Sequence, residues 1–413
     1  MAVVKPFRGL RPVPELAAKV ASLPYDVMDS DEARCITEKN PYSFLRVTKS
    51  EVDLASGVDT HSPEVYAKAA ENLRKFIENN TLKQDEKNCF YIYKQQMGEH
   101  IQIGLVATAS VEEYNGNIIK KHELTRPDKE QDRVEHITAT QAQTGAVFLT
   151  YKADAAVNSI LARCMQQEPV YDFMSEDGII HTLYLVAKNE EITAIEQVFN
   201  KIDVLYIADG HHRSAAAARV CADYCQNNPG HTGEEEYNRF LAVIFPHNMM
   251  KIMDYNRVVT DLNALTAENF LEAVQVNFTI EKHSAGAYKP GQAHTFGMYL
   301  NGTWYKLTAK SGSFNEQNTL DKLDVNILQN NLLKPILGIT DPRTDKRINF
   351  VGGIRGMQEL ERLVDSSKYT VAFSLFPTSI EELMDIADAG EIMPPKSTWF
   401  EPKLRDAMVV HLI

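Results

Sequence analysis

The chain has 413 residues, of which 44% are hydrophobic and 24% are charged. This composition is typical of a folded protein, so neither disorder nor a fibrous fold is indicated, and the length allows roughly two or three domains of about 150 residues each. Its formal net charge of −13 argues against general binding to nucleic acid or to an anionic membrane surface, and an anionic ligand would need a local basic pocket. The first nine residues lack the apolar core of a signal peptide and no later stretch has the length of a transmembrane helix, which predicts a cytoplasmic protein without a membrane partner.

The first half of the chain mixes strand and helix signals. Breaks at Pro24 and Pro41 favour strands and turns over residues 1–50. A serine followed by proline, with apolar residues at helical spacing, predicts a helix over residues 62–79. Further along, the pattern indicates a hairpin from 89–93 and 101–107, a strand at 118–122, a helix over 128–136 and an apolar run at 146–149.

The second half begins with the elements around residue 210. A β-prone apolar run at 204–208 precedes an alanine-rich helix from residue 214, and a polar loop at 227–233 separates that helix from a strand at 240–245. A new series of elements starts near residue 260, with a helix over 267–276 and an Asn-Gly hairpin from 297–300 and 304–307. We therefore expect two domains, residues 1–260 and 261–413.

The segment Asp209–Arg213 carries the clearest chemical signal. It reads Asp-Gly-His-His-Arg and lies between a buried strand and the start of a helix. Gly210 allows a ligand to approach the backbone, while the free amides and the positive end of the helix dipole attract an anion. Arg213 adds a planar group suited to phosphate oxygens. His211 and His212 can donate hydrogen bonds or move protons, and Asp209 could hold magnesium or accept a hydroxyl proton.

A purely structural interpretation of this segment is also available. Aspartate often caps a helix, a glycine turn often closes a strand-helix corner, and histidine or arginine can simply solvate a surface. Five consecutive residues of this kind after a buried strand favour the functional interpretation.

Other segments allow both interpretations. Residues 120–126 concentrate cations and a carboxylate, and Lys129 and Arg133 follow on a helix, so they could bind phosphate or form a solvated charged face. Residues 393–403 present lysines and hydroxyls on a proline-stiffened loop, which could bind a polar ligand or be anchored structurally by Trp399.

Cys221 and Cys225 could hold a metal but lack a second pair of ligands. No G-x-x-x-x-G-K-[ST] loop occurs, which excludes the ordinary P-loop route to ATP chemistry.

The segment Asp209–Arg213 resembles the signature of the free L-serine kinases, which have the ParB/sulfiredoxin fold. Nearly the whole chain resembles a larger prokaryotic family related to those kinases and long labelled as a domain of unknown function. The marks of this resemblance are residues 23–27, 122–125, 208–213 and 393–398. It implies an α+β fold, with a ParB/sulfiredoxin-like catalytic core that contains insertions and a C-terminal α/β domain that contributes to the active site.

The same resemblance implies roles for individual residues. Asp26 follows Pro24 where the kinases carry a glutamate that acts as base, so Asp26, Asp209 and His212 would be catalytic, and Asp209 would also position magnesium. The remaining roles follow the matched motifs: Gly210, His211, Arg213, His122, Glu123, Thr125 and Arg133 would bind the nucleotide phosphates, and Lys396, Ser397 and Thr398 would bind the substrate. Relatives are expected to carry histidine where Asn256 stands, which would alter that position here.

The leading hypothesis is a kinase that uses Mg²⁺ and transfers a phosphoryl group from ATP or ADP to the hydroxyl of free L-serine, giving O-phospho-L-serine. The alternative is a non-catalytic nucleotide-binding regulator of ParB-like type, although the negative charge disfavours its DNA-binding version. A sulfiredoxin-like reductase would need a cysteine where His211 stands. We expect nucleotide and free L-serine as partners, no nucleic acid, and a possible homodimer.

Overall fold

A computed structural model describes residues 1–413 and shows two compact units. Unit 1 comprises Met1–Met250 together with Pro402–Ile413, and unit 2 comprises Lys251–Glu401. The division falls at residue 250 instead of 260, and the end of the chain belongs to unit 1. No helix has both the length and the apolar character needed to cross a membrane.

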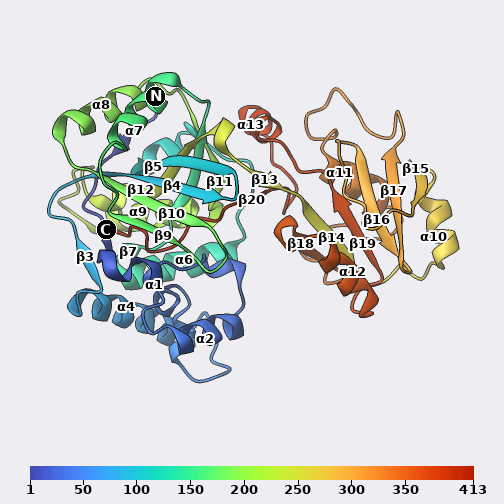
Figure 1. The fold of residues 1–413 in the computed structure, drawn as a ribbon, viewed down its shortest axis with the longest axis horizontal. Helices are drawn as coiled ribbons and strands as arrows, with labels where there is room; N and C mark the ends of the chain where they lie inside the picture. The colour runs from blue at the N-terminus through green and yellow to red at the C-terminus, as the bar shows by residue number, and fades with distance from the viewer. The chain divides into compact units, whose positions relative to one another are not determined.

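Unit 1 is built on a nine-stranded sheet (Figure 1). Most neighbouring strands are antiparallel, while the pairs β11–β6 and β12–β8 are parallel. The order is β6 (Ile119–Lys120), β11 (Leu205–Asp209), β8 (Val147–Tyr151), β12 (Arg239–Pro246), β5 (His100–Ser110), β4 (Phe90–Met97), β10 (Ile180–Val186) and β9 (Tyr171–Met174), and β1 (Val4–Lys5) also pairs with β5.

Helices and two small sheets complete unit 1. The helices are α1 (Ala17–Val20), α2 (Ser30–Lys39), α3 (Leu45–Thr48), α4 (Pro63–Glu78), α5 (Val111–Asn115), α6 (Pro127–Thr140), α7 (Ala155–Cys164), α8 (Asn189–Phe199) and α9 (His211–Asn227). The small sheets pair β2 (Leu10–Pro12) with β3 (Leu82–Gln84) and β7 (Ala142–Gln143) with β21 (His411–Leu412). The last pair ties the C-terminal end of the chain to the segment that follows α6.

Burial of apolar side chains fixes the positions of the helices. The main core lies between the sheet and helices α5, α7, α8 and α9. Helices α6 and α9 pack on each other through Val134, Ile137, Ala216 and Val220, which stand at helical spacing on the facing sides. A separate smaller core holds the N-terminal elements against Ala142 and the C-terminal segment.

Unit 2 contains a six-stranded antiparallel sheet. Its order is β15 (Phe278–His283), β17 (Thr303–Ala309), β16 (Thr295–Leu300), β19 (Val371–Leu375), β14 (Tyr255–Val259) and β18 (Ile348–Gly352). The other elements are α10 (Ala267–Val274), α11 (Asp324–Leu328), α12 (Met357–Asp365), α13 (Ile380–Asp388) and the pair β13 (Ile252–Met253) and β20 (Trp399–Phe400). The predicted α+β class is confirmed for the chain, because helices and mainly antiparallel sheets occur together.

Candidate functional site

The turn between β11 and α9 is shaped by one glycine. Gly210 has a φ of 98° and caps α9, and its carbonyl accepts hydrogen bonds from the amides of Arg213 and Ser214 at 3.0 Å each. A Cβ at this position would lie 3.3 Å from the Cα of Val147 on the neighbouring strand. Glycine is therefore required both for the left-handed backbone and for the close approach of β8.

Asp209 at the end of β11 is held by a lysine from the C-terminal segment. The Nζ of Lys403 donates a hydrogen bond of 2.9 Å to Oδ2 of Asp209. Burial by itself would raise the pKa of Asp209, but the ammonium of Lys403 and, more weakly, the guanidinium of Arg213 together hold that pKa below its ordinary value. The carboxylate is therefore ionised at neutral pH while its side chain remains 44% exposed.

Arg213 brings two distant carboxylates to the turn. Its Nη1 donates to the carbonyl of Ala146 at 2.8 Å, and its Nη2 lies 3.9 Å from Oδ1 of Asp26. On Gly145 a Cβ would lie 2.6 Å from Oδ1 of Asp406 and 3.2 Å from Cζ of Arg213. The absence of a side chain at Gly145 thus lets Asp406 and Arg213 approach each other.

A second arginine lies in the same region. The Cζ of Arg133 on α6 is 3.8 Å from the centre of the Tyr25 ring, and the Cζ of Arg213 is 5.7 Å from it. Arg133 also donates to the adjacent Asp132 at 2.7 and 3.0 Å. Tyr25, Arg133, Arg213 and Asp406 line a cavity of about 30 Å³, and this volume is enough for one ordered water molecule.

Asp406 is the most unusual titratable group of the cavity. It is 2% exposed, and its Oδ2 has no hydrogen-bond partner. Burial raises the pKa of Asp406 to about 7, Arg213 opposes this rise, and Asp26 adds to it. The carboxyl therefore changes its protonation near neutral pH.

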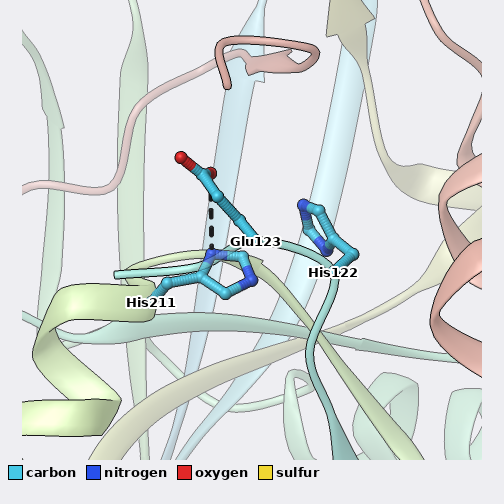
Figure 2. Close-up of side chains that lie close together, drawn as sticks. All are labelled: His122, Glu123 and His211. Carbon is cyan, nitrogen blue, oxygen red and sulfur yellow. Dashed lines mark ion pairs between the residues drawn. The ribbon is translucent and has the colours of Figure 1, made fainter. Parts of the chain in front are cut away.

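His122, Glu123 and His211 form a compact group beside the turn (Figure 2). The two imidazole rings are perpendicular, with centroids 4.5 Å apart, and Nδ1 of His211 lies 4.0 Å from Oε2 of Glu123. Burial lowers the pKa of His122 to about 4 and also lowers that of His211. Both rings are therefore neutral at pH 7, which is the form of histidine that binds metals.

His212 contacts the loop that precedes α6, and Thr125 in that loop contacts α6 itself. The amide of Arg126 donates to Nε2 of His212 at 3.1 Å, and the hydroxyl of Thr125 donates to Glu130 at 2.7 Å. A neutral His212 ring that accepts at Nε2 carries its proton on Nδ1. The structure thus gathers the predicted residues of unit 1 around the turn between β11 and α9.

Comparison with known families identifies the chain. A family model described as "Protein of unknown function (DUF1015)" matches residues 4–326. The chain belongs to the DUF1015 family. The resemblance seen in the sequence, to a large family labelled as a domain of unknown function, is thereby confirmed. A search of curated proteins finds no match.

Several solved structures are similar to this DUF1015 chain. A conserved hypothetical protein from Pyrococcus furiosus is 14% identical, with a TM-score of 0.38 over 75% of this chain and 95% of its own. A mutant free serine kinase in complex with AMP is 11% identical, with a TM-score of 0.37 over 74% and 92%. SbnI with a C-terminal truncation from Staphylococcus aureus is 12% identical, with a TM-score of 0.37 over 73% and 87%. Similarities of this size do not assign an activity.

The predicted substrate-binding residues of the DUF1015 chain lie in unit 2. The hydroxyl of Ser397 donates to the carbonyl of Pro394 at 2.7 Å, and the carbonyl of Lys396 accepts from Arg257 at 3.0 Å. Thr398 follows on the same loop. Their role in binding a substrate stays a prediction.

Asn256 has a structural role in unit 2. It is fully buried, and its amide group donates to Asp254 at 2.6 Å, while its carbonyl oxygen accepts from the amide of Leu375 at 3.1 Å. The contact with Leu375 ties β14 to β19, so asparagine satisfies hydrogen bonds at this buried position.

Two residues of the site were missed by sequence reasoning. The sequence indicates Lys403 only as one of the lysines of the C-terminal loop, and it gives no signal for Asp406. Both reach the site because residues 402–413 belong to unit 1, whose other residues are 1–250. A single aspartate or lysine near the end of a chain gives no local signal for such a contact.

Proposed function

We propose that this DUF1015 protein is a phosphotransferase that uses ATP or ADP to phosphorylate the hydroxyl of free L-serine. The observation that carries the proposal is the turn at Gly210, where an ionised aspartate, a lysine and an arginine meet the start of a long helix. Nucleotide-dependent phosphoryl transfer requires this combination of anion binding and charge neutralisation. The resemblance of Asp209–Arg213 to the free serine kinase signature supports the choice of acceptor.

The phosphates would bind at the N-terminus of α9. Amides of the first helical turn and the helix dipole attract anionic oxygens, and Gly210 leaves the backbone open to them. Arg213 and Lys403 both supply positive charge near Asp209. In a protein of net charge −13, this local group of cations is what would allow a polyphosphate to bind.

The acceptor hydroxyl would be activated by a carboxylate. Asp26 is 55% exposed and lies near Arg213, so it can reach a small molecule placed beside the phosphates and act as the base. His212, with its proton on Nδ1, can donate to a phosphate oxygen. By the family resemblance, Lys396, Ser397 and Thr398 of unit 2 are proposed as substrate-binding residues.

Magnesium fits the carboxylate at the end of β11. Asp209 is ionised and half-exposed, as an oxygen ligand for this ion must be. Bound with the nucleotide, magnesium would neutralise charge that develops on the phosphates. The residues of the chain would then position the nucleotide and the hydroxyl in line.

The direct test is incubation of the purified protein with ATP or ADP, magnesium and a panel of free amino acids, followed by phosphorus NMR. We expect a phosphomonoester signal that appears only with L-serine. Nucleotide binding without any product that depends on an amino acid would contradict the kinase and favour the non-catalytic nucleotide-binding regulator.

A further inference from the structure

Three metal-binding side chains meet next to the proposed nucleotide site. His122 and Glu123 follow β6, and His211 is the first residue of α9, so two segments far apart in sequence supply the group (Figure 2). Each side chain offers one ligand atom, and these three atoms lie within 4.8 Å of one another.

Two ring nitrogens of this group are buried without a hydrogen-bond partner. They are Nδ1 of His122 and Nε2 of His211, in residues only 2% and 6% exposed. Buried polar atoms are nearly always paired in folded proteins, so two orphaned nitrogens in one small cluster point to a missing ligand. The His122 ring also forms a hydrogen bond with the backbone of Ile207, and such a contact orients a metal-binding histidine and fixes its tautomer.

The kinds of ligand atom select the kind of metal. Magnesium prefers oxygen atoms and keeps much of its water, whereas imidazole nitrogen suits zinc and other divalent transition metals. Two histidines and one glutamate form a known zinc ligand set that leaves a further coordination position open. Glu123 is 34% exposed while both rings are buried, so an ion could enter from the side of the glutamate.

We propose that His122, Glu123 and His211 bind a divalent transition metal ion of the zinc class, whose open position takes water or a phosphate oxygen of the ligand. The metal site rests on the proposed function in one respect only, which is that the phosphate belongs to the nucleotide. Ligand atoms around tetrahedral zinc lie about 3.3 Å apart, given bonds of about 2.0–2.1 Å. The three ligand atoms would therefore approach one another by at most about 1.5 Å on binding, a change within the reach of side-chain rotation.

The test is a calorimetric titration of the chelator-treated full chain with Zn²⁺ alone, in the absence of nucleotide. We expect one ion per chain, and a dissociation constant at least about tenfold weaker in Glu123→Gln and His211→Gln. Glu112→Gln changes an exposed glutamate of α5 and should bind as the parent does. Circular dichroism of each variant verifies that it is folded.

A pair of cysteines beside a histidine could also bind Zn²⁺ in the titration and requires its own control. Sγ of Cys225 lies 3.8 Å from Sγ of Cys221 and 3.5 Å from Nε2 of His231. Cys225→Ser should keep the zinc site intact. The Co²⁺ form of the unmodified chain, which does not depend on any variant being folded, should show the visible bands of nitrogen and oxygen ligands and no thiolate charge-transfer band.

Three results would overturn the metal site: no stoichiometric Zn²⁺ binding, binding unchanged in Glu123→Gln and His211→Gln, or binding lost in Cys225→Ser with a thiolate band in the Co²⁺ form. These outcomes can be distinguished from a failure of the proposed kinase activity. Phosphoserine formation with magnesium in a chain that does not bind zinc would leave the proposed function standing. Zinc binding without phosphoryl transfer would leave the metal site standing.

Discussion

The pair formed by Lys403 and Asp209 sets the charge of the proposed site. The ammonium lies 2.9 Å from the carboxylate and helps to keep it ionised. In the proposed complex with a polyphosphate and magnesium, the same ammonium would turn toward a phosphate oxygen. Lys403 would therefore balance the charge of the site both before and after the ligand binds.

Lys403→Met should lower kcat/KM for the nucleotide by about 10- to 100-fold, since a hydrogen bond to a charged group contributes about 1.5–3 kcal/mol. Lys403→Arg should recover part of the loss because it keeps the charge. Lys201→Met, at an exposed lysine outside the site, serves as the matched control in the same steady-state assay. Equal kcat/KM for Lys403→Met and the control would remove Lys403 from the mechanism.

Asp406 makes the stability of unit 1 depend on pH. Its pKa is raised by burial from 3.8 to about 7, so the folded chain holds this proton more tightly than the unfolded chain. Binding of this proton therefore stabilises the folded chain in full below about pH 4. The stabilisation decreases as the pH rises from there and is lost once the pH has passed 7. Between pH 5 and pH 8 the loss amounts to at most about 3 kcal/mol.

Asp406→Asn should therefore remove this part of the pH dependence. Urea unfolding of both chains at pH 5 and pH 8 measures it, since the contributions of all other groups cancel in the comparison. We expect the variant to gain stability relative to the parent at pH 8. Parallel pH profiles for the two chains would show that Asp406 titrates normally.

Part of the site could be predicted from the sequence and part could not. The segment Asp209–Arg213 is continuous and combines a strand, a glycine and a helix start, so its position and its chemistry are local properties. The family resemblance implied a catalytic role for Asp26, and the structure places its Oδ1 3.9 Å from Nη2 of Arg213. Lys403 and Asp406 depend on the packing of the chain end, which no local pattern encodes.

At the scale of helices and strands, the elements with strong local sequence patterns were predicted correctly. The helix predicted over 62–79 is α4, and the two hairpins are β4–β5 and β16–β17. In the second hairpin Asn301 and Gly302 both have positive φ, as a two-residue Asn-Gly turn requires. Helix α2 lies within residues 1–50, where proline breaks had favoured strands and turns; its start is marked by a capping box of Asp29 and Glu32.

The turn between β11 and α9 should tolerate no side chain at Gly210. Gly210→Ala should destabilise unit 1 by about 1–3 kcal/mol, because φ is positive and β8 lies within 3.3 Å of the new Cβ. Gly230→Ala provides the control, since that Cβ would meet only a side-chain oxygen at 3.5 Å. Thermal unfolding of both variants makes the comparison, and equal melting temperatures would show that the turn is not strained.

At the scale of the whole molecule, the chain leaves unit 1 at Met250 and returns to it at Pro402. The returning segment buries Leu404, Met408, Val409 and Val410 and adds β21 to β7. It therefore belongs to the core of unit 1 as well as to the proposed site.

Deletion of residues 402–413 should severely destabilise unit 1. Four buried apolar side chains contribute roughly 6–12 kcal/mol in all at 1.5–3 kcal/mol each, which is comparable to the whole stability of a typical domain. Hydrogen exchange can follow the two units separately: amides of β8 and β12 should lose protection while those of β16 and β19 keep theirs. Unchanged protection in β8 and β12 would show that the segment is dispensable.

The carboxylate at the end of β11 is proposed to take part in phosphoryl transfer. The most direct test of this role is the rate of O-phospho-L-serine formation, followed by phosphorus NMR, for the parent chain, Asp209→Asn and the control Asp223→Asn at an exposed position of α9. We predict that Asp209→Asn loses at least about 100-fold in rate with its circular dichroism unchanged, while the control keeps the parent rate. Phosphoserine formation by Asp209→Asn at the parent rate would contradict the account.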